Sequence, residues 1–137
     1  MILCSGCFDG LHAGHVRYLQ AAYDRRVESL PHHYGGEGLV VALASDAYIR
    51  RVKRREPRWS YAERMETLLA LVMVDEVVEH SEVGVADVIL ATRPRVFVKG
   101  HDWMGGLRDD VRDACEAVGA QIVFVNTPAK HTSEAFA

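Results

Sequence analysis

Short apolar runs rich in β-branched residues alternate along the sequence with segments in which apolar residues recur at helical spacing. Alternating strand and helix is the pattern of a parallel sheet with helices packed on both of its faces. The apolar runs predict five strands, at residues 2–8, 39–44, 76–79, 96–99 and 121–125. We therefore expect an α/β fold with a five-stranded parallel sheet. Such sheets bind ligands at the carboxyl ends of their strands, so functional residues should follow a strand directly.

Apolar stripes and helix-start signals predict four helices between these strands. Ser60 and Glu63 form a capping box, in which the serine side chain accepts from a first-turn N–H and the glutamate reaches back. The buried stripes that we expect are His15, Leu19 and Ala22 within residues 13–26; Met65, Leu68, Leu69 and Val72; Val85, Val88 and Ile89; and Leu107, Val111, Cys115 and Val118. Two stretches break the alternation: a glycine-rich segment at 29–38, which predicts a surface loop, and a basic run at 50–58.

Composition limits the class of protein. With 137 residues, 49% of them hydrophobic and 26% charged, the chain fits one compact domain over residues 1–137. The strand-helix alternation makes the expected domain Rossmann-like. Sixteen Lys and Arg against nineteen Asp and Glu give a net charge of −3, so we expect no nucleic acid as a partner. No apolar run approaches the ~20 residues of a membrane-spanning helix. We therefore expect no membrane partner and a cytoplasmic protein without a targeting segment.

The three cysteines, Cys4, Cys7 and Cys115, are too few and odd in number for a disulfide framework. Cys4 and Cys7 are spaced as C-x-x-C, which occurs in redox pairs and in half of a zinc site. No second C-x-x-C completes a tetrahedral set, and the motif falls in a predicted buried strand rather than at a helix N-terminus. We expect neither a redox pair nor a bound metal ion at these cysteines.

The most informative segment lies where the first strand turns into the first helix. It reads Gly6-Cys7-Phe8-Asp9-Gly10-Leu11-His12-Ala13-Gly14-His15. His12 and His15 fall on one side of the helix start, and Gly14 between them lets the backbone approach a ligand closely. First-turn N–H groups point outward at such a start, so the segment favours a phosphate. A single histidine here would more often be an ordinary helix-end residue, but the spacing, the preceding strand, the glycine and Asp9 agree.

This H-x-G-H pattern resembles the signature of the nucleotidyltransferase superfamily that includes the cytidylyltransferases. Further segments resemble motifs of that family in the same order, and they are residues 40–46, 60–64, 74–77, 96–103 and 130–133. Two subfamilies fit: the glycerol-3-phosphate cytidylyltransferases, and the adenylyltransferase domain that makes ADP-heptose. The first usually carries arginines where this chain has Val72 and Thr127, and Lys130-His131 fully matches the final turn of neither.

The resemblance implies transfer of a nucleoside monophosphate from CTP or ATP to a phosphorylated sugar or polyol. Pyrophosphate leaves, Mg²⁺ is present, no covalent enzyme intermediate forms, and the protein is a homodimer. His12 and His15 would serve the α- and β-phosphates, with Lys53 of the basic run as the third catalytic residue. A neighbouring arginine within residues 50–55 is the alternative to Lys53, and most of the run fits a solvated basic face while one or two of its cations should touch substrate. The implied nucleotide-binding residues are Gly6, Cys7, Phe8, Asp9, Gly14, Arg64, Lys99, Gly100, Asp102, Trp103, Thr132 and Ser133.

A non-catalytic nucleotide-binding module of the same architecture is the main alternative, because a fold does not determine a function. Such a module would bind ATP or CTP without turnover. A redox or zinc protein built on Cys4 and Cys7 is a more distant alternative, which metal content and a thiol titration would reveal. Neither alternative accounts for the two histidines of the H-x-G-H pattern, Arg64 and Lys99 together.

Overall fold

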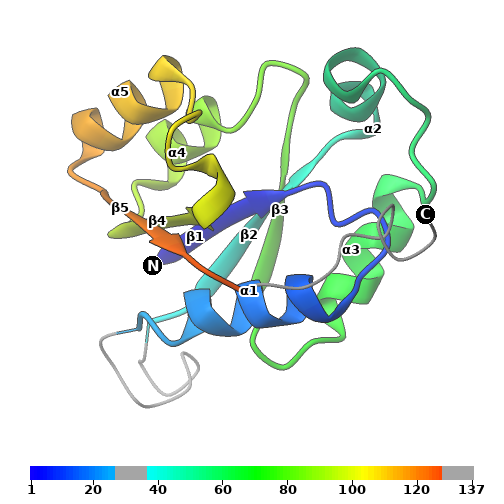
Figure 1. Cartoon of the computed structure of the whole chain (residues 1–137), viewed down its shortest axis with the longest axis horizontal. Helices are drawn as coiled ribbons and strands as arrows, with labels where there is room; N and C mark the ends of the chain where they lie inside the picture. Colours follow the sequence, from blue (N-terminus) through cyan, green and yellow to red (C-terminus); the bar gives the residue numbers. More distant parts are fainter. Residues whose placement is uncertain (27–36, 128–137) are drawn as a thin grey trace.

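The computed structural model describes residues 1–26 and 37–127, and their five strands form one parallel sheet of order β3-β2-β1-β4-β5 (Figure 1). The elements, in chain order, are β1 (Ile2–Gly6), α1 (Ala13–Tyr23), β2 (Leu39–Ala44), α2 (Asp46–Tyr48), the π-helical turn η2 (Ile49–Lys53), α3 (Tyr61–Leu69), β3 (Glu76–His80), α4 (Ala86–Thr92), β4 (Val96–Gly100), the 3-10 turn η3 (His101–Trp103), α5 (Asp109–Val118) and β5 (Gln121–Val125). The expected α/β fold is confirmed. No helix in these two ranges has the length and apolar character needed to cross a membrane.

Helices cover both faces of the sheet, which explains why the strands read as continuous apolar runs. Successive side chains of a strand point to opposite faces. On β1, Ile2 and Cys4 pack with Leu19 of α1 and Leu68 of α3. Leu3, between them, packs on the other face against α4 and α5. Both faces of the central strand are therefore buried, as the β-branched composition predicted.

The chain reverses direction across the sheet between β1 and β4. It builds β1, β2 and β3 outward to one edge, then crosses back so that β4 pairs with the other side of β1. At such a switch point, the loops that follow the two neighbouring strands diverge to opposite faces and leave a crevice. The loop after β1 carries the H-x-G-H pattern, and η3 follows β4, so both predicted motifs lie at this crevice.

Several predicted boundaries were wrong. β1 ends at Gly6 rather than residue 8, because Phe8 has a positive φ of 45° that turns the chain out of the strand. α1 ends at Tyr23 rather than residue 26. α3 ends at Leu69, so Val72 of the predicted stripe lies beyond the helix and is 93% exposed.

The buried face of α3 also differs from the predicted one. Leu69 is 48% exposed, whereas Arg64 and Leu68 are the buried residues of the helix. A hydropathy pattern could not predict this buried face, because the charged side chain of Arg64 occupies a buried position where an apolar side chain is expected. The predicted loop at 29–38 falls largely outside the described residues. The basic run at 50–58 begins as the helical turn η2.

The residue that follows α5 allows a test of the cost of a left-handed backbone conformation. Gly119 follows this helix with φ 72°, and a Cβ built there meets nothing within 4 Å. Gly119→Ala should therefore lower the free energy of unfolding by about 1 kcal/mol through backbone strain alone. Urea denaturation measures this, with Gly105→Ala as the control, since Gly105 also has open space but lies outside the left-handed region. Equal losses in the two variants would contradict the explanation.

Candidate active site

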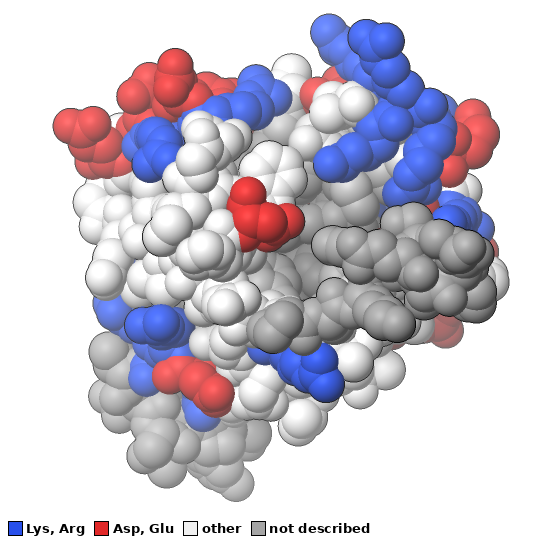
Figure 2. Space-filling view, viewed as in Figure 1, with Lys and Arg blue, Asp and Glu red and all other residues white. Residues whose placement is uncertain are grey.

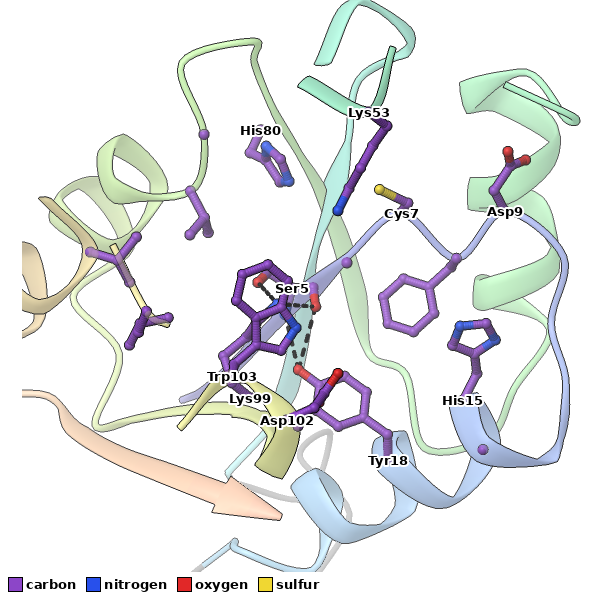
Figure 3. A pocket seen from close by; sticks show the side chains of 18 of the residues that line it. Ser5, Cys7, Asp9, His15, Tyr18, Lys53, His80, Lys99, Asp102 and Trp103 are labelled. Carbon is purple, nitrogen blue, oxygen red and sulfur yellow. Dashed lines mark hydrogen bonds between the residues drawn. The ribbon is translucent and has the colours of Figure 1, made fainter. Parts of the chain in front are cut away.

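A cavity of about 750 Å³ opens at the carboxyl edge of the sheet (Figure 3). The loop after β1, the turn η2, the end of β3, the turn η3 and the start of α5 all contribute to its walls. The predicted site residues that line it are Gly6, Cys7, Phe8, Asp9, His12, Gly14, His15, Lys53, Lys99, Gly100, Asp102 and Trp103. Of the other predicted residues, Arg64 is not among the lining residues, and Thr132 and Ser133 lie outside the described ranges.

The two histidines of the H-x-G-H pattern are fixed by the helix start itself. His12 is the N-cap of α1, and its Nδ1 accepts a hydrogen bond from the Gly14 N–H at 3.0 Å. The Nδ1 of His15 accepts from the His12 N–H at 3.3 Å, which completes a capping box. The imidazole rings stack with their centroids 3.9 Å apart. Because each Nδ1 is an acceptor, the Nε2 atoms carry the protons, so the pair is a source of N–H donors at the cavity.

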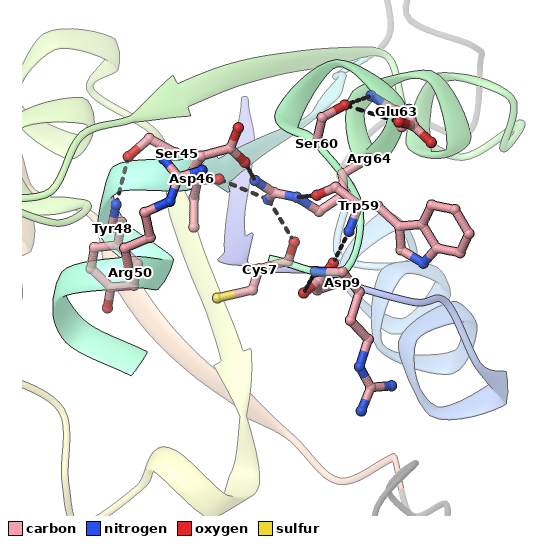
Figure 4. A network of polar contacts seen from close by, with 12 residues as sticks. Cys7, Asp9, Ser45, Asp46, Tyr48, Arg50, Trp59, Ser60, Glu63 and Arg64 are labelled. Atoms are coloured by element: carbon pink, nitrogen blue, oxygen red, sulfur yellow. Dashed lines mark hydrogen bonds and ion pairs between the residues drawn. The ribbon is translucent and has the colours of Figure 1, made fainter. Parts of the chain in front are cut away.

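Asp9 holds the loop after β1 to the segment before α3 (Figure 4). Its carboxylate accepts hydrogen bonds from the Arg55 guanidinium at 2.6 Å and from the N–H groups of Arg58 and Trp59 at 2.8 and 2.9 Å. Burial acts to raise the pKa of Asp9, but these three hydrogen bonds outweigh it and lower the pKa. Asp9 was predicted to bind nucleotide, and it lines the cavity. In the structure both of its carboxylate oxygens accept hydrogen bonds that anchor the loop.

Two lysines approach the ring of Trp103. The Lys99 Nζ lies 4.8 Å from the ring centroid, and the Lys53 Nζ lies 5.7 Å from it. The Lys99 ammonium also donates to the carbonyl and the hydroxyl of Ser5, each at 3.3 Å. Burial is the main reason that the pKa of Lys99 is lowered, and the charge of Lys53 adds to the effect. Two cations close to one aromatic face are a site for a polyanion that would neutralise both.

Arg64, which was predicted to bind nucleotide, is buried and does not line the cavity (Figure 4). Its side chain is 1% exposed, and its guanidinium donates to the backbone carbonyls of Cys7, Ala44 and Trp59 at 2.9, 2.7 and 3.0 Å. It also pairs with the Asp46 carboxylate at 2.7 Å. These contacts leave Arg64 away from the cavity surface. It joins the loops after β1 and β2.

The net charge is −3, but the basic and acidic side chains are unevenly distributed over the surface. Lys and Arg side chains gather over the corner formed by α2 and η2, whereas Asp and Glu cluster over α5 (Figure 2). Lys53 ends η2 and points into the cavity (Figure 3). The side of the cavity formed by η2 is therefore basic, which suits an anionic ligand.

The cavity also contains residues that sequence reasoning missed. Among them are Tyr18, Tyr48, His80, Arg108 and Asp110. His80 is the last residue of β3, so its place at a strand end was a readable signal. Tyr48 and Arg108 carried no such signal in the sequence. The register between β2 and β3 brings Tyr48 to the cavity, and the crossover from β4 to α5 brings Arg108 there.

The cysteines have no reactive or metal-binding arrangement within the described ranges. Cys4, Cys7 and Cys115 are free thiols. Burial raises the pKa of Cys4 to about 12, which makes its thiol a poor nucleophile at neutral pH. Burial also raises the pKa of Cys7, against the charges of Lys53 and Arg64. Residues 1–26 and 37–127 contain no group of three or more His, Cys, Asp or Glu side chains that could hold a metal ion.

The paired imidazoles and the two lysines at one crevice agree with a family-model match. The model of the cytidylyltransferase-like family matches residues 3–134. The chain belongs to this family. It is a nucleotidyltransferase, as the H-x-G-H pattern predicted.

Curated relatives of this cytidylyltransferase-like chain carry the name bifunctional protein HldE. The protein from Halorhodospira halophila is 45% identical over 104 residues, which cover 75% of this chain and 20% of the relative. The protein from Geobacter sulfurreducens is 37% identical over 127 residues, which cover 91% of this chain and 24% of the relative. The chain therefore spans at most about a quarter of the length of these two relatives.

Solved structures share the fold. A lipopolysaccharide core biosynthesis protein from Thermoplasma volcanium superposes with a TM-score of 0.73 at 21% identity, covering 93% of this chain and 97% of that one. A protein with unknown function from Archaeoglobus fulgidus has a TM-score of 0.68 at 19% identity, covering 96% and 93%. At these identities the likeness concerns the arrangement of strands and helices alone.

The Arg64 network predicts a large stability effect. Arg64→Met keeps the apolar stem but leaves three carbonyls and a carboxylate without their donor. We expect the free energy of unfolding to fall by roughly 3–5 kcal/mol. Arg64→Lys should recover little, since one ammonium cannot reach acceptors spread around a planar guanidinium. Urea denaturation measures both, and Arg54→Met, at an exposed arginine, is the control. An Arg64→Met protein as stable as the control would refute the structural role.

His80 predicts an acid-dependent loss of stability. Burial lowers the pKa of this ring, aided by the charges of Lys99 and Arg64 and opposed by a hydrogen bond to Ser81. The unfolded chain therefore binds a proton more readily than the native one, so this part of the stability is lost as the pH falls below about 6.5.

The measurement compares unfolding free energies between about pH 7 and pH 5. We expect His80→Phe, which keeps a ring beside neutral Tyr48, to lose less stability on acidification than the unsubstituted protein. His101→Phe, at an exposed histidine, should follow the unsubstituted protein. Parallel pH profiles for all three proteins would show that His80 does not contribute.

Proposed function

We propose that this chain transfers a nucleoside monophosphate from CTP or ATP to a phosphorylated sugar or polyol and releases pyrophosphate. The observation that carries the proposal is the joint geometry of His12 and His15, whose Nδ1 atoms are both used in capping so that their N–H donors are held in a fixed direction. Lys53 and Lys99 supply positive charge in the same cavity. This set matches a triphosphate rather than a redox or zinc function.

In the proposed reaction a phosphate oxygen of the acceptor attacks the α-phosphorus of the triphosphate. The new P–O bond forms as the bond from the α-phosphorus to the bridging oxygen breaks, and that oxygen leaves with its electron pair on pyrophosphate. Negative charge spreads over the α-phosphoryl oxygens and the leaving group. Fixed N–H donors and ammonium groups stabilise such charge more strongly in a shielded cavity than in water. His12, His15 and Lys53 take this role.

Mg²⁺ fits the cavity only as a metal carried by the triphosphate. The described residues offer no cluster of three or more ligands, and Mg²⁺ characteristically binds substrate phosphates with one or two carboxylates and several waters. Of the three aspartates that line the cavity, Asp9 bonds to the segment before α3 and Asp110 pairs with Arg108, so Asp102 is the one that would bind it. When bound, Mg²⁺ would neutralise charge on the phosphates. The proposed roles of His12, His15 and Lys53 stand on their own geometry.

The relatives support a sugar-phosphate acceptor without fixing it. The chain covers only 20% of the Halorhodospira halophila HldE protein, so the activities of the whole relative are not carried over. The nucleotide base stays open between cytosine and adenine. The expected homodimer also stays a prediction, which light scattering on the purified protein tests.

Pyrophosphate release is the direct test of the proposal. ATP and CTP are each combined with Mg²⁺ and a panel of sugar and polyol phosphates, with the His12/His15 double alanine variant as the blank. Nucleotide binding is followed separately by the fluorescence of Trp103 in a Trp59→Phe background, since Trp103 is the tryptophan beside both lysines. We expect release with one nucleotide and one class of acceptor. Binding without release across the panel would support the non-catalytic binding module instead.

His15 provides the sharpest variant for the proposed chemistry. His15→Ala should lower kcat by about 10²–10³, because it removes one N–H donor from the charge that develops on the phosphates. His15→Gln is the matched control for folding, since glutamine at this position can still accept from the N-cap N–H. We expect it to restore the stability lost in His15→Ala but not the rate. A glutamine variant with a near-normal kcat would remove the imidazole from the mechanism.

A further inference from the structure

The part of the cavity away from the H-x-G-H pattern has no role in phosphate binding as described so far. It is lined by Tyr48 of α2, by His80 at the end of β3, and by Arg108 and Asp110 at the start of α5. Arg108 and Asp110 form an ion pair at 2.9 Å, and the charges of both act on the Tyr48 phenol. This wall therefore presents polar groups whose formal charges are compensated. It suits a neutral, hydrogen-bonding part of a substrate better than a phosphate.

The His80 ring is held in one orientation. Its side chain ends β3 and is buried, with only 5% of the residue exposed. The backbone carbonyl accepts from the Ser45 N–H at 3.0 Å, which fixes the strand end. The Tyr48 ring meets the imidazole edge-on, with centroids 4.6 Å apart and planes at 85°. His80 thus faces the cavity in a defined pose (Figure 3).

The hydrogen bonds of His80 assign its tautomer. Its Nδ1 lies 3.2 Å from the carbonyl oxygen of Ser81. A carbonyl oxygen only accepts, so Nδ1 carries the proton and Nε2 carries a lone pair. Within residues 1–26 and 37–127 the structure gives Nε2 no hydrogen-bond partner. His80 is therefore the reverse of His12 and His15, because it offers the cavity an acceptor where they offer donors.

An acceptor nitrogen at this place discriminates between ligand groups. A phosphate monoester has a second pKa of about 6 and is mostly dianionic at neutral pH, so its oxygens repel the lone pair of a neutral His80 rather than donate to it. A hydroxyl group can donate to Nε2. The Tyr48 hydroxyl, which has no hydrogen-bond partner among the described residues, can donate to the same hydroxyl or to its neighbour.

We propose that His80 and Tyr48 recognise a hydroxyl group on the carbon chain of the acceptor and thereby select a polyol or sugar phosphate over a phosphate ester that lacks this hydroxyl. The inference rests on the proposed function and names the wall of the cavity that recognises the acceptor substrate. The phosphate of the acceptor then lies toward Lys53, and the hydroxyl-bearing carbons lie toward the end of β3. His80 is a specificity residue in this scheme and takes no part in the bond-making step.

The tautomer is tested first, by ¹⁵N NMR of the histidine rings at neutral pH. The His80 signals are assigned by their loss in His80→Phe. We expect a neutral ring protonated at Nδ1. A ring protonated at Nε2, or a charged ring, would overturn the inference whatever the enzyme's activity, because Nε2 would then be a donor.

Acceptor selectivity is tested with glycerol 3-phosphate and mannose 1-phosphate, each against analogues in which single hydroxyl groups are replaced by hydrogen. For the acceptor that turns over, one deoxy analogue should show kcat/KM lowered about 3- to 10-fold in the unsubstituted protein. His80→Phe should lower kcat/KM for the full acceptor by the same factor through KM, leave KM for the nucleotide unchanged, and no longer distinguish that deoxy analogue. Tyr48→Phe should reduce the discrimination in part.

Tyr61→Phe, which removes a phenol hydroxyl on α3 outside the cavity, is the matched control and should keep full discrimination. Turnover in which His80→Phe still distinguishes every deoxy analogue would overturn the inference while leaving the proposed function intact. Nucleotide binding without pyrophosphate release from either acceptor or from the wider panel would overturn the proposed function, and the inference with it.

Discussion

The guanidinium of Arg64 joins the parts of the chain from which the site is built. Its donors reach the carbonyl after β1, the carbonyl at the end of β2 and the carbonyl that precedes α3, and its charge is balanced by Asp46 of α2. Only arginine has enough N–H groups, in a rigid plane, to bind acceptors from several directions. A buried charge is tolerated here because every contact also satisfies a backbone or carboxylate oxygen. The loops that carry the histidines and Lys53 start from this junction.

The cavity combines two kinds of hydrogen-bonding surface. Near α1 and η3 it offers donors and cations, because His12 and His15 use their Nδ1 atoms for the helix cap and the lysines gather at Trp103. Near β3 it offers an acceptor nitrogen and a phenol, beside an ion pair that compensates its own charge. A molecule with phosphate groups at one end and hydroxyl groups at the other matches this division.

The sequence predicted those features whose cause is local. Strands 39–44 and 121–125 were found with correct bounds because β-branched apolar runs form them directly. The two histidines were found because three-residue spacing at a helix start places side chains together whatever the rest of the fold does. Arg64 was found but its role in joining the loops was not, since its partner Cys7 lies 57 residues away and no local pattern shows that contact. Tyr48 was missed because its ring meets His80 only through the packing of α2 against the end of β3, whereas His80 follows a predicted strand directly and could have been found.

The position of β1 between β2 and β4 has a consequence for how the enzyme is assembled during folding. The bond from Lys99 to Ser5 spans 94 residues of sequence, so the crevice closes only after the chain has returned from the far edge of the sheet. Closing a loop of this length costs conformational entropy, and this cost precedes the stabilising contacts that the closed loop makes. Such contacts therefore form slowly. A nascent chain that has built β1, β2 and β3 already holds both histidines but has not yet brought Lys99 to them. The cations and donors of the proposed phosphate site therefore meet only when the second half of the sheet has paired with β1.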